Sequence, residues 1–374
     1  MKLSIERSAL LRSLSHVQNV VERRTTIPIL ANVKLETGDG ELALTATDLD
    51  LALATRETAE IREPGATTVA AHLLFEIVRK LPEGCEVELA QPPDGNELEL
   101  RAARSVFQLP TLPAADFPPL GEDGLDISFA MPAADLARLI DKTRFAISTE
   151  ETRYYLNGIH IHPLAAGAAS VLRGVATDGH RLARVEVALP GGAERLPPII
   201  VPRKTVNELR KLLGESEAEI ELAVSANRMR CVVDRAILVS RLIDGPFPDY
   251  ERVIPKPEDT DRVAVMEVRA FKDAVDRVST ISTERTRAVK LGFTAGGVTI
   301  SAVSAEAGRA VEELDVEYSG DPLEIGFNAR YILDILGEIE GEQVRMEMTS
   351  PAAPTVLRDP ADSSTLYVLM PMRV

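Results

Sequence analysis

One string of the sequence combines residue types that catalyse reactions in many enzymes. Residues 177–182 place Asp178, His180 and Arg181 within four positions of one another. A catalytic histidine needs a partner that fixes its tautomer and a nucleophile within hydrogen-bond reach. No GxSxG, HExxH, P-loop or dinucleotide-binding fingerprint supplies such a nucleophile elsewhere in the chain. Asp-Gly is a turn dipeptide, and residues 47–50 occupy the matching place earlier in the chain, so we interpret the string as a turn after a strand. An enzyme that uses Asp178 and His180 is the alternative.

Two other sets of residues have the chemistry of metal ligands. His160 and His162 alternate on a predicted strand, so both side chains point to one face of it. With no carboxylate or cysteine near them, we expect a hydrogen-bonded surface pair and no metal site. Cys85 and Cys231 stand far apart without CxxC spacing, which argues against zinc and for two reduced thiols. We therefore expect no catalytic residue, no metal site and no cofactor.

The balance of charge argues against tight binding to DNA. The 374 residues include 58 acidic and 42 basic residues, a net charge of −16, whereas close phosphate contact needs clustered Lys and Arg. A protein of this charge that handles DNA must segregate its charges or hold the duplex by topology. The chain has no apolar run of the roughly 18 residues that a membrane span needs. Charged residues within positions 1–7 argue against a signal peptide, so we expect a cytoplasmic protein without membrane contact.

The predicted elements recur three times along the chain. One kind of helix opens each third, and a second kind follows about 60 residues later. Apolar residues at the i, i+3, i+4, i+7 spacing mark predicted helices at residues 10–21, 74–81, 136–143, 206–213, 271–278 and 332–339. Pro202 precedes the fourth helix, and Asn328 stands where an N-cap would begin the sixth.

Between the predicted helices the apolar period changes to two. Residues 42–46, 171–176 and 298–303 show this pattern, and later short runs in each third are separated by Gly, Asn or Pro. Short strands joined by turns predict hairpins and antiparallel sheet. Each third therefore resembles two halves, each with one helix packed on a four-stranded antiparallel sheet. The predicted class is α+β with three repeated domains, which span residues 1–125, 126–253 and 254–374.

The solvent faces of the predicted helices are more basic than the whole chain. Five of the six carry Lys and Arg in excess, as at Arg203, Lys204, Arg210 and Lys211 on the fourth. Acidic residues gather instead on predicted strands, among them residues 312–317. For any single helix the alternative is an ordinary solvated face. Agreement among five predicts that the helices face one common polyanion, make weak phosphate contacts, and leave the sheets facing outward.

Two aromatic or apolar segments each allow two interpretations. Tyr154 and Tyr155 are adjacent in a loop, where they are either core anchors or contacts for a strand or peptide. The C-terminal run of Met370, Pro371 and Met372 either fills a core or forms an adaptable wall for varied ligands.

Six strings of the sequence together resemble one family. They span residues 111–118, 153–158, 176–183, 201–204, 247–250 and 367–373. In order and spacing they are similar to the bacterial DNA polymerase III beta subunit over the whole chain. The resemblance implies a replication sliding clamp, a processivity factor without catalytic activity of its own. It also implies a head-to-tail homodimer whose domains form a ring around double-stranded DNA, with helices lining the hole.

The resemblance further implies a partner groove between the second and third domains. In the family this groove takes a short extended peptide from the polymerase III alpha subunit, the clamp loader, other polymerases and repair factors. The matching residues are Leu156, Thr177, Gly179, His180, Arg181, Leu182, Pro248, Arg252, Val253, Tyr331, Val368, Leu369, Met370, Pro371, Met372 and Arg373. Ala352 and Pro354 stand where the family's pocket has bulkier or hydroxyl side chains, and Val374 replaces a leucine. We therefore expect a shallower far wall with a different ligand preference.

DNA contacts and the dimer interface follow from the resemblance in the same way. The implied DNA-contact residues are Arg24, Tyr154, Tyr155, Arg203, Lys204 and Lys211. Glu150 stands in the tyrosine loop where the family has an uncharged polar residue, so we expect weaker DNA contact there. Phe107 of the first domain and Ile281 of the third are implied to contribute to the dimer interface. A repeat-built adaptor that binds peptides and never encircles DNA is the remaining alternative, and it predicts a monomer.

Overall fold

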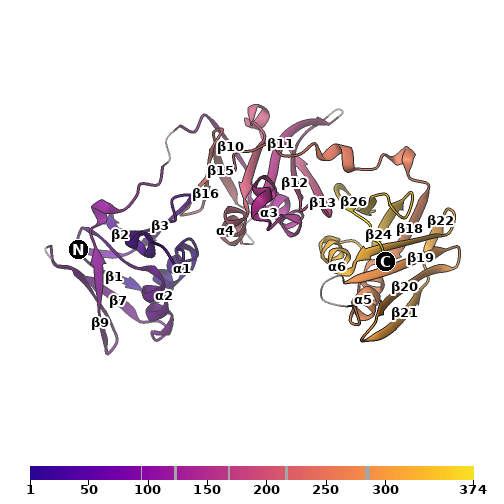
Figure 1. The fold of residues 1–374 in the computed structure, drawn as a ribbon. Helices are drawn as coiled ribbons and strands as arrows, with labels where there is room; N and C mark the ends of the chain where they lie inside the picture. Colours follow the sequence, from indigo (N-terminus) through magenta and orange to yellow (C-terminus); the bar gives the residue numbers. More distant parts are fainter. Residues whose placement is uncertain (94, 122–123, 167–168, 215–217, 283–286) are drawn as a thin grey trace. The chain divides into compact units, whose positions relative to one another are not determined.

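The computed structural model describes residues 1–93, 95–121, 124–166, 169–214, 218–282 and 287–374, and many of its elements are labelled in Figure 1. Contacts divide the chain into two compact units. Unit 1 comprises Met1–Ala137, Pro190–Pro197 and Lys204–Leu242, and unit 2 comprises Arg138–Leu189, Pro198–Arg203 and Ile243–Val374. The division passes through the middle third because strands of that third pair with strands of both other thirds. The domain boundaries near 125 and 253 stay a prediction.

The described residues contain two α-helices in each third. They are α1 (Arg7–Val17), α2 (Ala71–Lys80), α3 (Ala133–Asp141), α4 (Arg203–Leu213), α5 (Val268–Ser279) and α6 (Ala329–Glu338). All six predicted helices are present, although α1 ends at Val17, before the predicted end at Val21. The side chain of Asn328 accepts a hydrogen bond from Arg330 N–H at 3.0 Å, which confirms the predicted cap of α6.

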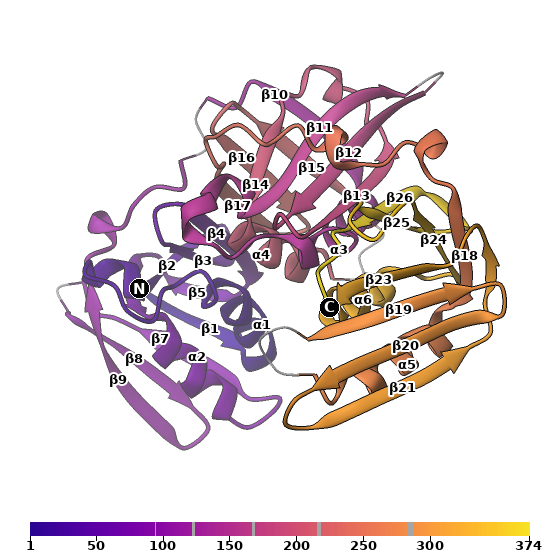
Figure 2. The same cartoon turned by 45° about the vertical axis from the view of Figure 1, so that its right-hand side comes forward.

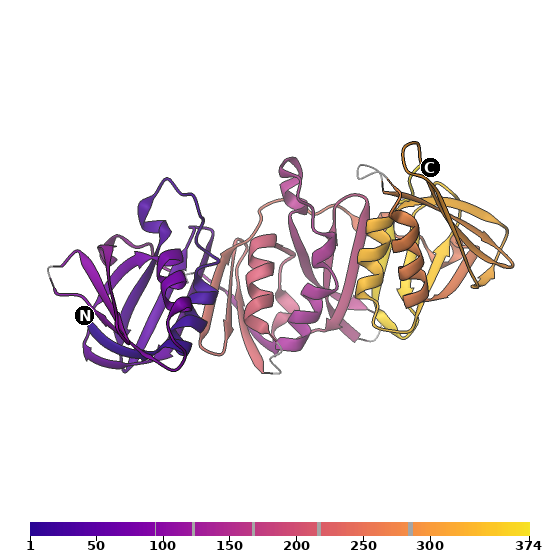
Figure 3. The same ribbon diagram turned by 90° about the horizontal axis from the view of Figure 1, so that it is seen from below.

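The apolar stripes explain why these segments fold as helices. In α5, Phe271, Ala274, Val275 and Val278 are all buried, as their spacing predicted. Burial of one such large side chain stabilises the fold by about 1.5–3 kcal/mol. The helix α1 lies beside α2 in unit 1, and α5 lies beside α6 in unit 2, as Figure 3 shows.

The strands are short and lie before, between and after the helices of each third. Those of the first third are β1 (Lys2–Glu6), β2 (Asn32–Gly38), β3 (Glu41–Thr47), β4 (Leu51–Thr58), β5 (Glu60–Glu63), β6 (Ala66–Ala70), β7 (Glu86–Ala90), β8 (Glu97–Ala102) and β9 (Ser105–Leu112). Those of the middle third are β10 (Ile127–Pro132), β11 (Gly158–Ala166), β12 (Ala169–Thr177), β13 (Arg181–Ala188), β14 (Ile199–Pro202), β15 (Glu219–Val224), β16 (Arg228–Val233) and β17 (Ala236–Arg241). Those of the last third are β18 (Arg262–Glu267), β19 (Ala288–Thr294), β20 (Gly297–Ser304), β21 (Gly308–Leu314), β22 (Glu317–Ser319), β23 (Leu323–Asn328), β24 (Gln343–Met348), β25 (Thr355–Asp359) and β26 (Asp362–Leu369).

These strands form three sheets within the described ranges. The sheet of unit 1 has the order β10-β15-β16-β17-β4-β3-β2-β6-β9-β8-β7-β1-β5. The sheets of unit 2 have the orders β14-β11-β12-β13-β26-β25-β24-β18-β22 and β21-β20-β19-β23, and Figure 2 shows the latter in orange and yellow. The predicted α+β class, with helices packed on antiparallel sheets, is confirmed.

Two strand pairs extend the sheets from one third of the chain into the next. We call the antiparallel pairing of β4 with β17 in unit 1 the first junction, and that of β13 with β26 in unit 2 the second junction. The sequence pattern predicted separate four-stranded sheets and did not indicate these junctions. No helix in the described part of the chain is long and apolar enough to cross a membrane.

Candidate functional site

The string with enzyme-like residues is a hydrogen-bonded turn between β12 and β13, which we call the Asp178 turn (residues 177–181). Asp178 Oδ1 accepts hydrogen bonds from the backbone N–H of His180 at 2.9 Å and of Arg181 at 3.0 Å. Thr177 Oγ1 accepts from Gly179 N–H at 3.1 Å and donates to Arg181 O at 2.7 Å. Gly179 has φ +88°, in the left-handed region that favours glycine. The polar side chains therefore close a turn, which confirms the turn interpretation.

Arg181 is the most heavily bonded side chain of this turn. Its guanidinium donates to Asp178 Oδ2 at 3.1 Å, to Asp334 Oδ2 at 2.5 Å and to Phe145 O at 2.6 Å. It also lies over the rings of Phe145 and Tyr331, 5.1 and 4.4 Å from their centroids. Since Asp334 and Tyr331 belong to α6, the buried Arg181 joins the middle third to the last third of the chain.

The C-terminal segment Met370–Val374, which we call the tail, follows β26 directly. Leu182 pairs with Val368 and Arg181 with Leu369 across the second junction. Met370 N–H donates to His180 O at 2.9 Å, so the pairing continues into the tail. The exposed imidazole of His180 stacks beside Tyr331, with ring centroids 6.1 Å apart. Sequence positions almost 200 residues apart thus meet at the Asp178 turn.

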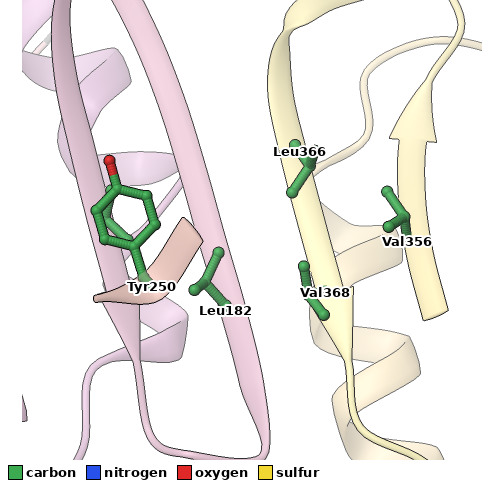
Figure 4. Packing of buried hydrophobic residues seen from close by; sticks show 6 residues of the cluster. Leu182, Tyr250, Val356, Leu366 and Val368 are labelled. Carbon is green, nitrogen blue, oxygen red and sulfur yellow. The ribbon is translucent and has the colours of Figure 1, made fainter. Parts of the chain in front are cut away.

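An apolar cluster lies across the second junction. Its members, which we call the second-junction cluster, are Val175, Leu182, Tyr250, Val356, Leu366 and Val368. Figure 4 shows Leu182 of β13 beside Tyr250, with Leu366 and Val368 on β26 and Val356 on β25. Phe247 and Ile254 pack against the cluster, and exposed Val253 precedes Ile254. Met370 and Met372, which were expected to form a wall with Pro371, follow Val368 of this cluster along the chain.

His160 and His162 contact the aromatic side chains of Phe247 and Tyr250 at the cluster. The Tyr250 hydroxyl lies 2.9 Å from His162 Nε2 and accepts a hydrogen bond from Arg173 at 3.0 Å. His160 stacks on Phe247 with a centroid distance of 4.6 Å. Burial, and after it the neighbouring His162, lowers the pKa of His160 to about 4. The predicted surface location of this pair is wrong, because the segment that carries Phe247 and Tyr250 covers both imidazoles.

A cavity of about 450 Å³ adjoins the Asp178 turn. It is lined by Arg144, Phe145, Ile147, Ser148, Thr149, Glu150, Asp178, His180, Arg181, Arg203, Arg330, Tyr331 and Asp334. Charged groups of both signs dominate this lining. Within the described residues there is no group of three or more His, Cys, Asp or Glu side chains that could hold a metal ion.

The structure brings most of the expected groove residues together and leaves some at the margin. Thr177 and residues 179–182 lie in or next to the Asp178 turn, where Tyr331 and residues 368–370 meet them. Pro248, Arg252 and Val253 are exposed on the segment that leads into the last third, and Arg252 pairs with Asp249 at 2.7 Å. Leu156 is buried below the tyrosine loop. Pro371 and Met372 are half-buried, while Arg373 and Ala352 are exposed and Pro354 is half-buried.

The expected DNA-contact residues differ in how free their side chains are. Tyr154 is 52% exposed, and its ring meets that of Tyr155 edge to face at 5.7 Å. Arg24 and Arg203 are exposed. Lys211 pairs with Glu208 at 2.7 Å. Glu150 pairs with Arg153 at 2.7 Å, so part of its charge is already balanced within the loop.

Lys204 is tied to three acceptors. Its ammonium donates to Val20 O at 2.8 Å, Glu22 Oε1 at 2.5 Å and Asp48 Oδ2 at 2.6 Å. Burial alone would lower the pKa of Lys204, but the hydrogen bonds to Asp48 and Glu22 raise it above its ordinary value. This ammonium therefore stabilises unit 1 and has little capacity left for a phosphate.

The expected dimer-interface residues lie in different units. Phe107 is half-buried in β9, and Ile281 is half-buried just after α5. Each is accessible in the single chain, and their role stays a prediction.

Several residues of the site had no clear sign in the sequence. Asp334, Phe145 and Val356 reach the turn or the cluster from distant segments. The alternation of β25 and β26 could have indicated Val356 and Leu366, since both face the side of the sheet that carries Val368. Asp334 and Phe145 could not have been found this way, because the packing of α6 brings Asp334 to Arg181, and the segment after α3 brings Phe145 there.

The sequence matches three family models that cover most of the chain. Residues 1–121 match the N-terminal domain of the DNA polymerase III beta subunit, residues 130–249 its central domain and residues 251–373 its C-terminal domain. The chain is 51% identical to the beta sliding clamp of Caulobacter vibrioides over 374 residues, with all of both chains covered. It is 41% identical to the beta sliding clamp of Escherichia coli K12 over 377 residues, again with all of both chains covered.

Solved structures of sliding clamps are similar over their whole length. A Caulobacter crescentus beta sliding clamp, with a polyethylene glycol at a putative beta-motif tethering region, superposes with a TM-score of 0.95 at 51% identity. A sliding clamp from Bartonella birtlesii bound to griselimycin superposes with a TM-score of 0.96 at 43% identity. Both comparisons cover 100% of each chain.

Proposed function

The chain belongs to the bacterial DNA polymerase III beta subunit family and is a DNA sliding clamp, and we propose that two copies close head to tail around duplex DNA. The observation that carries this is the match of three beta-subunit domains in order along one chain. Family membership confirms the prediction that the chain is a processivity factor, and it does not support the enzyme alternative. The clamp serves a DNA polymerase by keeping it on its template.

Ring closure requires complementary surfaces at the two ends of the chain. A head-to-tail interface is heterologous, so it closes only if the rotation between copies returns to the start. We assign Phe107 to the surface on the first domain and Ile281 to that on the third. Their half-buried side chains support this assignment.

DNA is held mainly by topology in this proposal. The net charge is −16, and helix cations such as Arg12 and Arg277 pair with Glu57 and Glu312. Pairing of this kind weakens attraction to phosphates, which suits a clamp that must move along the duplex. Arg24, Arg203 and Tyr154 stay exposed and supply transient, sequence-independent contacts.

Partners dock at the second junction by a short extended peptide. We propose that this site takes segments of the polymerase III alpha subunit, the clamp loader, other polymerases and repair factors. The second-junction cluster supplies apolar surface, and the two tail methionines supply adaptable side chains. The Bartonella relative binds the ligand griselimycin, and Ala352 and Pro354 would give the groove of this chain a different ligand preference. The clamp acts in the bacterial cytoplasm, where its DNA and polymerase are found.

Loading onto a DNA circle tests encirclement directly. The clamp is loaded onto nicked circular DNA with an active clamp loader and ATP, and retention is measured before and after the circle is cut once. We expect coelution with the circle and loss after linearisation, because cutting changes the topology and leaves local contacts unchanged. Equal retention on both forms would mean binding by affinity, and a monomeric mass without retention would favour the adaptor.

A further inference from the structure

The tail crosses one face of β23. Met372 N–H donates to Gly326 O at 2.9 Å, and the two residues form an antiparallel bridge. Glu324 and Asn328 lie on the same face of β23 as Gly326, since side chains alternate along a strand. Glu324 is exposed and Asn328 half-buried, yet Gly326 between them is buried. The tail therefore covers the strand at this glycine.

Gly326 leaves no room for a side chain. A Cβ atom there would lie 2.6 Å from Met372 O and 2.6 Å from both γ-carbons of Val374. Contacts below 3.0 Å force something to move, and the carbonyl oxygen of Met372 belongs to the backbone that makes the bridge. Any residue other than glycine would thus lift the tail from β23.

The tail is held at two backbone points. Met370 N–H donates to His180 O at 2.9 Å, and Met372 N–H donates to Gly326 O at 2.9 Å. In this segment the residue Met370 is 37% exposed, and Pro371 and Met372 are half-buried. Loss of the second point would leave the tail held only by the hydrogen bond of Met370, so Met372 would no longer be fixed on β23.

We propose that Gly326 is a positioning residue for the partner groove. Its missing side chain lets the tail dock on β23, and this docking fixes Met370 and Met372 as a wall beside the second-junction cluster. The inference rests on the proposed function of that groove. Gly326 itself touches no peptide, so it acts only through the tail.

The chain provides a matched control in the neighbouring strand. Gly292 of β19 pairs with Glu324 of β23, so it lies on the same face of the same sheet as Gly326. A Cβ atom at Gly292 would lie 3.8 Å from Thr299 O and 3.9 Å from Thr299 Cβ, which is ordinary van der Waals contact. Gly292→Ala therefore measures what an added methyl group in this sheet does without touching the tail.

The test compares Gly326→Ala, Gly292→Ala and a chain that ends at Leu369. The probe is a fluorescein-labelled peptide of the clamp-binding segment of the polymerase III alpha subunit, with binding followed by anisotropy. We expect Gly326→Ala to weaken binding by roughly tenfold or more, and Gly292→Ala to stay within about twofold of the unchanged chain. The chain that ends at Leu369 should bind the peptide at least as weakly as Gly326→Ala. Adding Gly326→Ala to that truncated chain should weaken binding no further, because both changes remove the wall formed by the tail.

Separate outcomes overturn the inference and the function on which it rests. Unchanged binding by Gly326→Ala, with weaker binding by the truncated chain, would overturn the role of Gly326. No peptide binding by the unchanged chain would overturn the groove itself. Dimer mass and melting temperature establish that Gly326→Ala is folded. NMR of ¹³C-methyl methionine gives a second reading: in Gly326→Ala the Met372 signal should move to its position in an unstructured peptide, and an unmoved signal contradicts the proposal.

Discussion

The chain joins its thirds at two junctions that share one backbone pattern and differ in their side chains. At the first junction, Thr47 Oγ1 donates to Leu51 O at 3.0 Å and Arg241 N–H to Asp50 O at 2.7 Å. At the second, Thr177 Oγ1 donates to Arg181 O at 2.7 Å and Met370 N–H to His180 O at 2.9 Å. Residues 47–51, which we call the Asp48 turn, thus correspond one by one to the Asp178 turn.

The rows of side chains across the two junctions are not alike. Strand register places Leu182, Val368 and Val356 in one row of the second junction. The corresponding row of the first junction contains Ala52, Val239 and Arg230. One repeat therefore yields an apolar surface at one junction and a charged one at the other.

The segments that leave each third reinforce this difference. At the first junction, Arg228 donates to Gly121 O at 2.9 Å and fastens residues 118–121 beside the sheet, which leaves a cavity of about 70 Å³. At the second junction Tyr250 joins the apolar cluster. From this comparison we infer that the shared backbone permits the proposed partner site and that the apolar row decides where it forms. The following changes test this, from the largest expected effect to the smallest.

Val356→Arg should give the second junction the composition of the first. Val356 is fully buried, so an arginine there places an unpaired charge in the apolar cluster. We expect loss of peptide binding by roughly a hundredfold and a fall in the free energy of unfolding of about 3 kcal/mol or more. Urea unfolding and peptide anisotropy measure both. Val356→Ala is the control, because it leaves the row apolar and should lower both the peptide affinity and the free energy of unfolding by less than Val356→Arg does. Equal losses in the two variants would contradict the role of the charge.

Acid should destabilise the second junction through His160. The folded pKa is about 4 against an ordinary 6.5, so the unfolded chain binds more protons between these values and stability is lost as pH falls from 6.5 toward 4. From pH 7.5 to 5 we expect a loss of about 2 kcal/mol at this residue. His160→Gln should remove most of that dependence in urea unfolding.

The first junction has no such histidines. Lys34 pairs with Thr45 as His160 pairs with Val175, so Lys34 and Glu36 stand at the positions that match His160 and His162. Lys34 and Glu36 form an ion pair at 2.8 Å. If His160→Gln keeps the pH dependence of the unchanged chain, the histidine pair does not set the acid response.

Lys204→Met should loosen the first junction without affecting the second. Asp48 loses the ammonium at 2.6 Å, whereas Asp178 keeps its own partner Arg181. We expect a fall in unfolding free energy of about 1 kcal/mol, since the side chain is partly exposed and solvent screens the pair. Peptide affinity should not change. A large loss of retention on circular DNA with no loss of stability would instead show that Lys204 serves mainly as a DNA contact.

Leu49→Gly should have the smallest effect and the opposite sign. Leu49 has φ +81° where the Asp178 turn has Gly179, and a left-handed conformation costs a leucine roughly 1 kcal/mol. Glycine removes that cost but gains freedom in the unfolded chain, so we expect a net stabilisation of about 0.5 kcal/mol or less. Thermal unfolding measures it. A destabilisation above about 1 kcal/mol would show that the exposed leucine makes contacts that glycine cannot replace.

Local patterns predicted the elements, and distant pairings produced the site. The six helices and the cap at Asn328 depend on spacing within one turn or two, which the sequence displays directly. The ion pair of Arg181 with Asp334 joins positions 153 residues apart, and no local pattern encodes it. The same holds for Gly326, whose importance appears only once the tail is seen to cross it. The groove residues came from resemblance to a family, because spacing alone left Met370 and Met372 as either core or wall.

Counting the peptide sites on each chain tests the comparison most directly. Calorimetric titration of the intact protein with the polymerase peptide should give one site per chain, and Val356→Arg should weaken it by roughly a hundredfold while Lys204→Met leaves it unchanged. Two sites of similar affinity per chain, or one site that keeps its affinity in Val356→Arg, would contradict the claim that the apolar row of the second junction makes the partner groove.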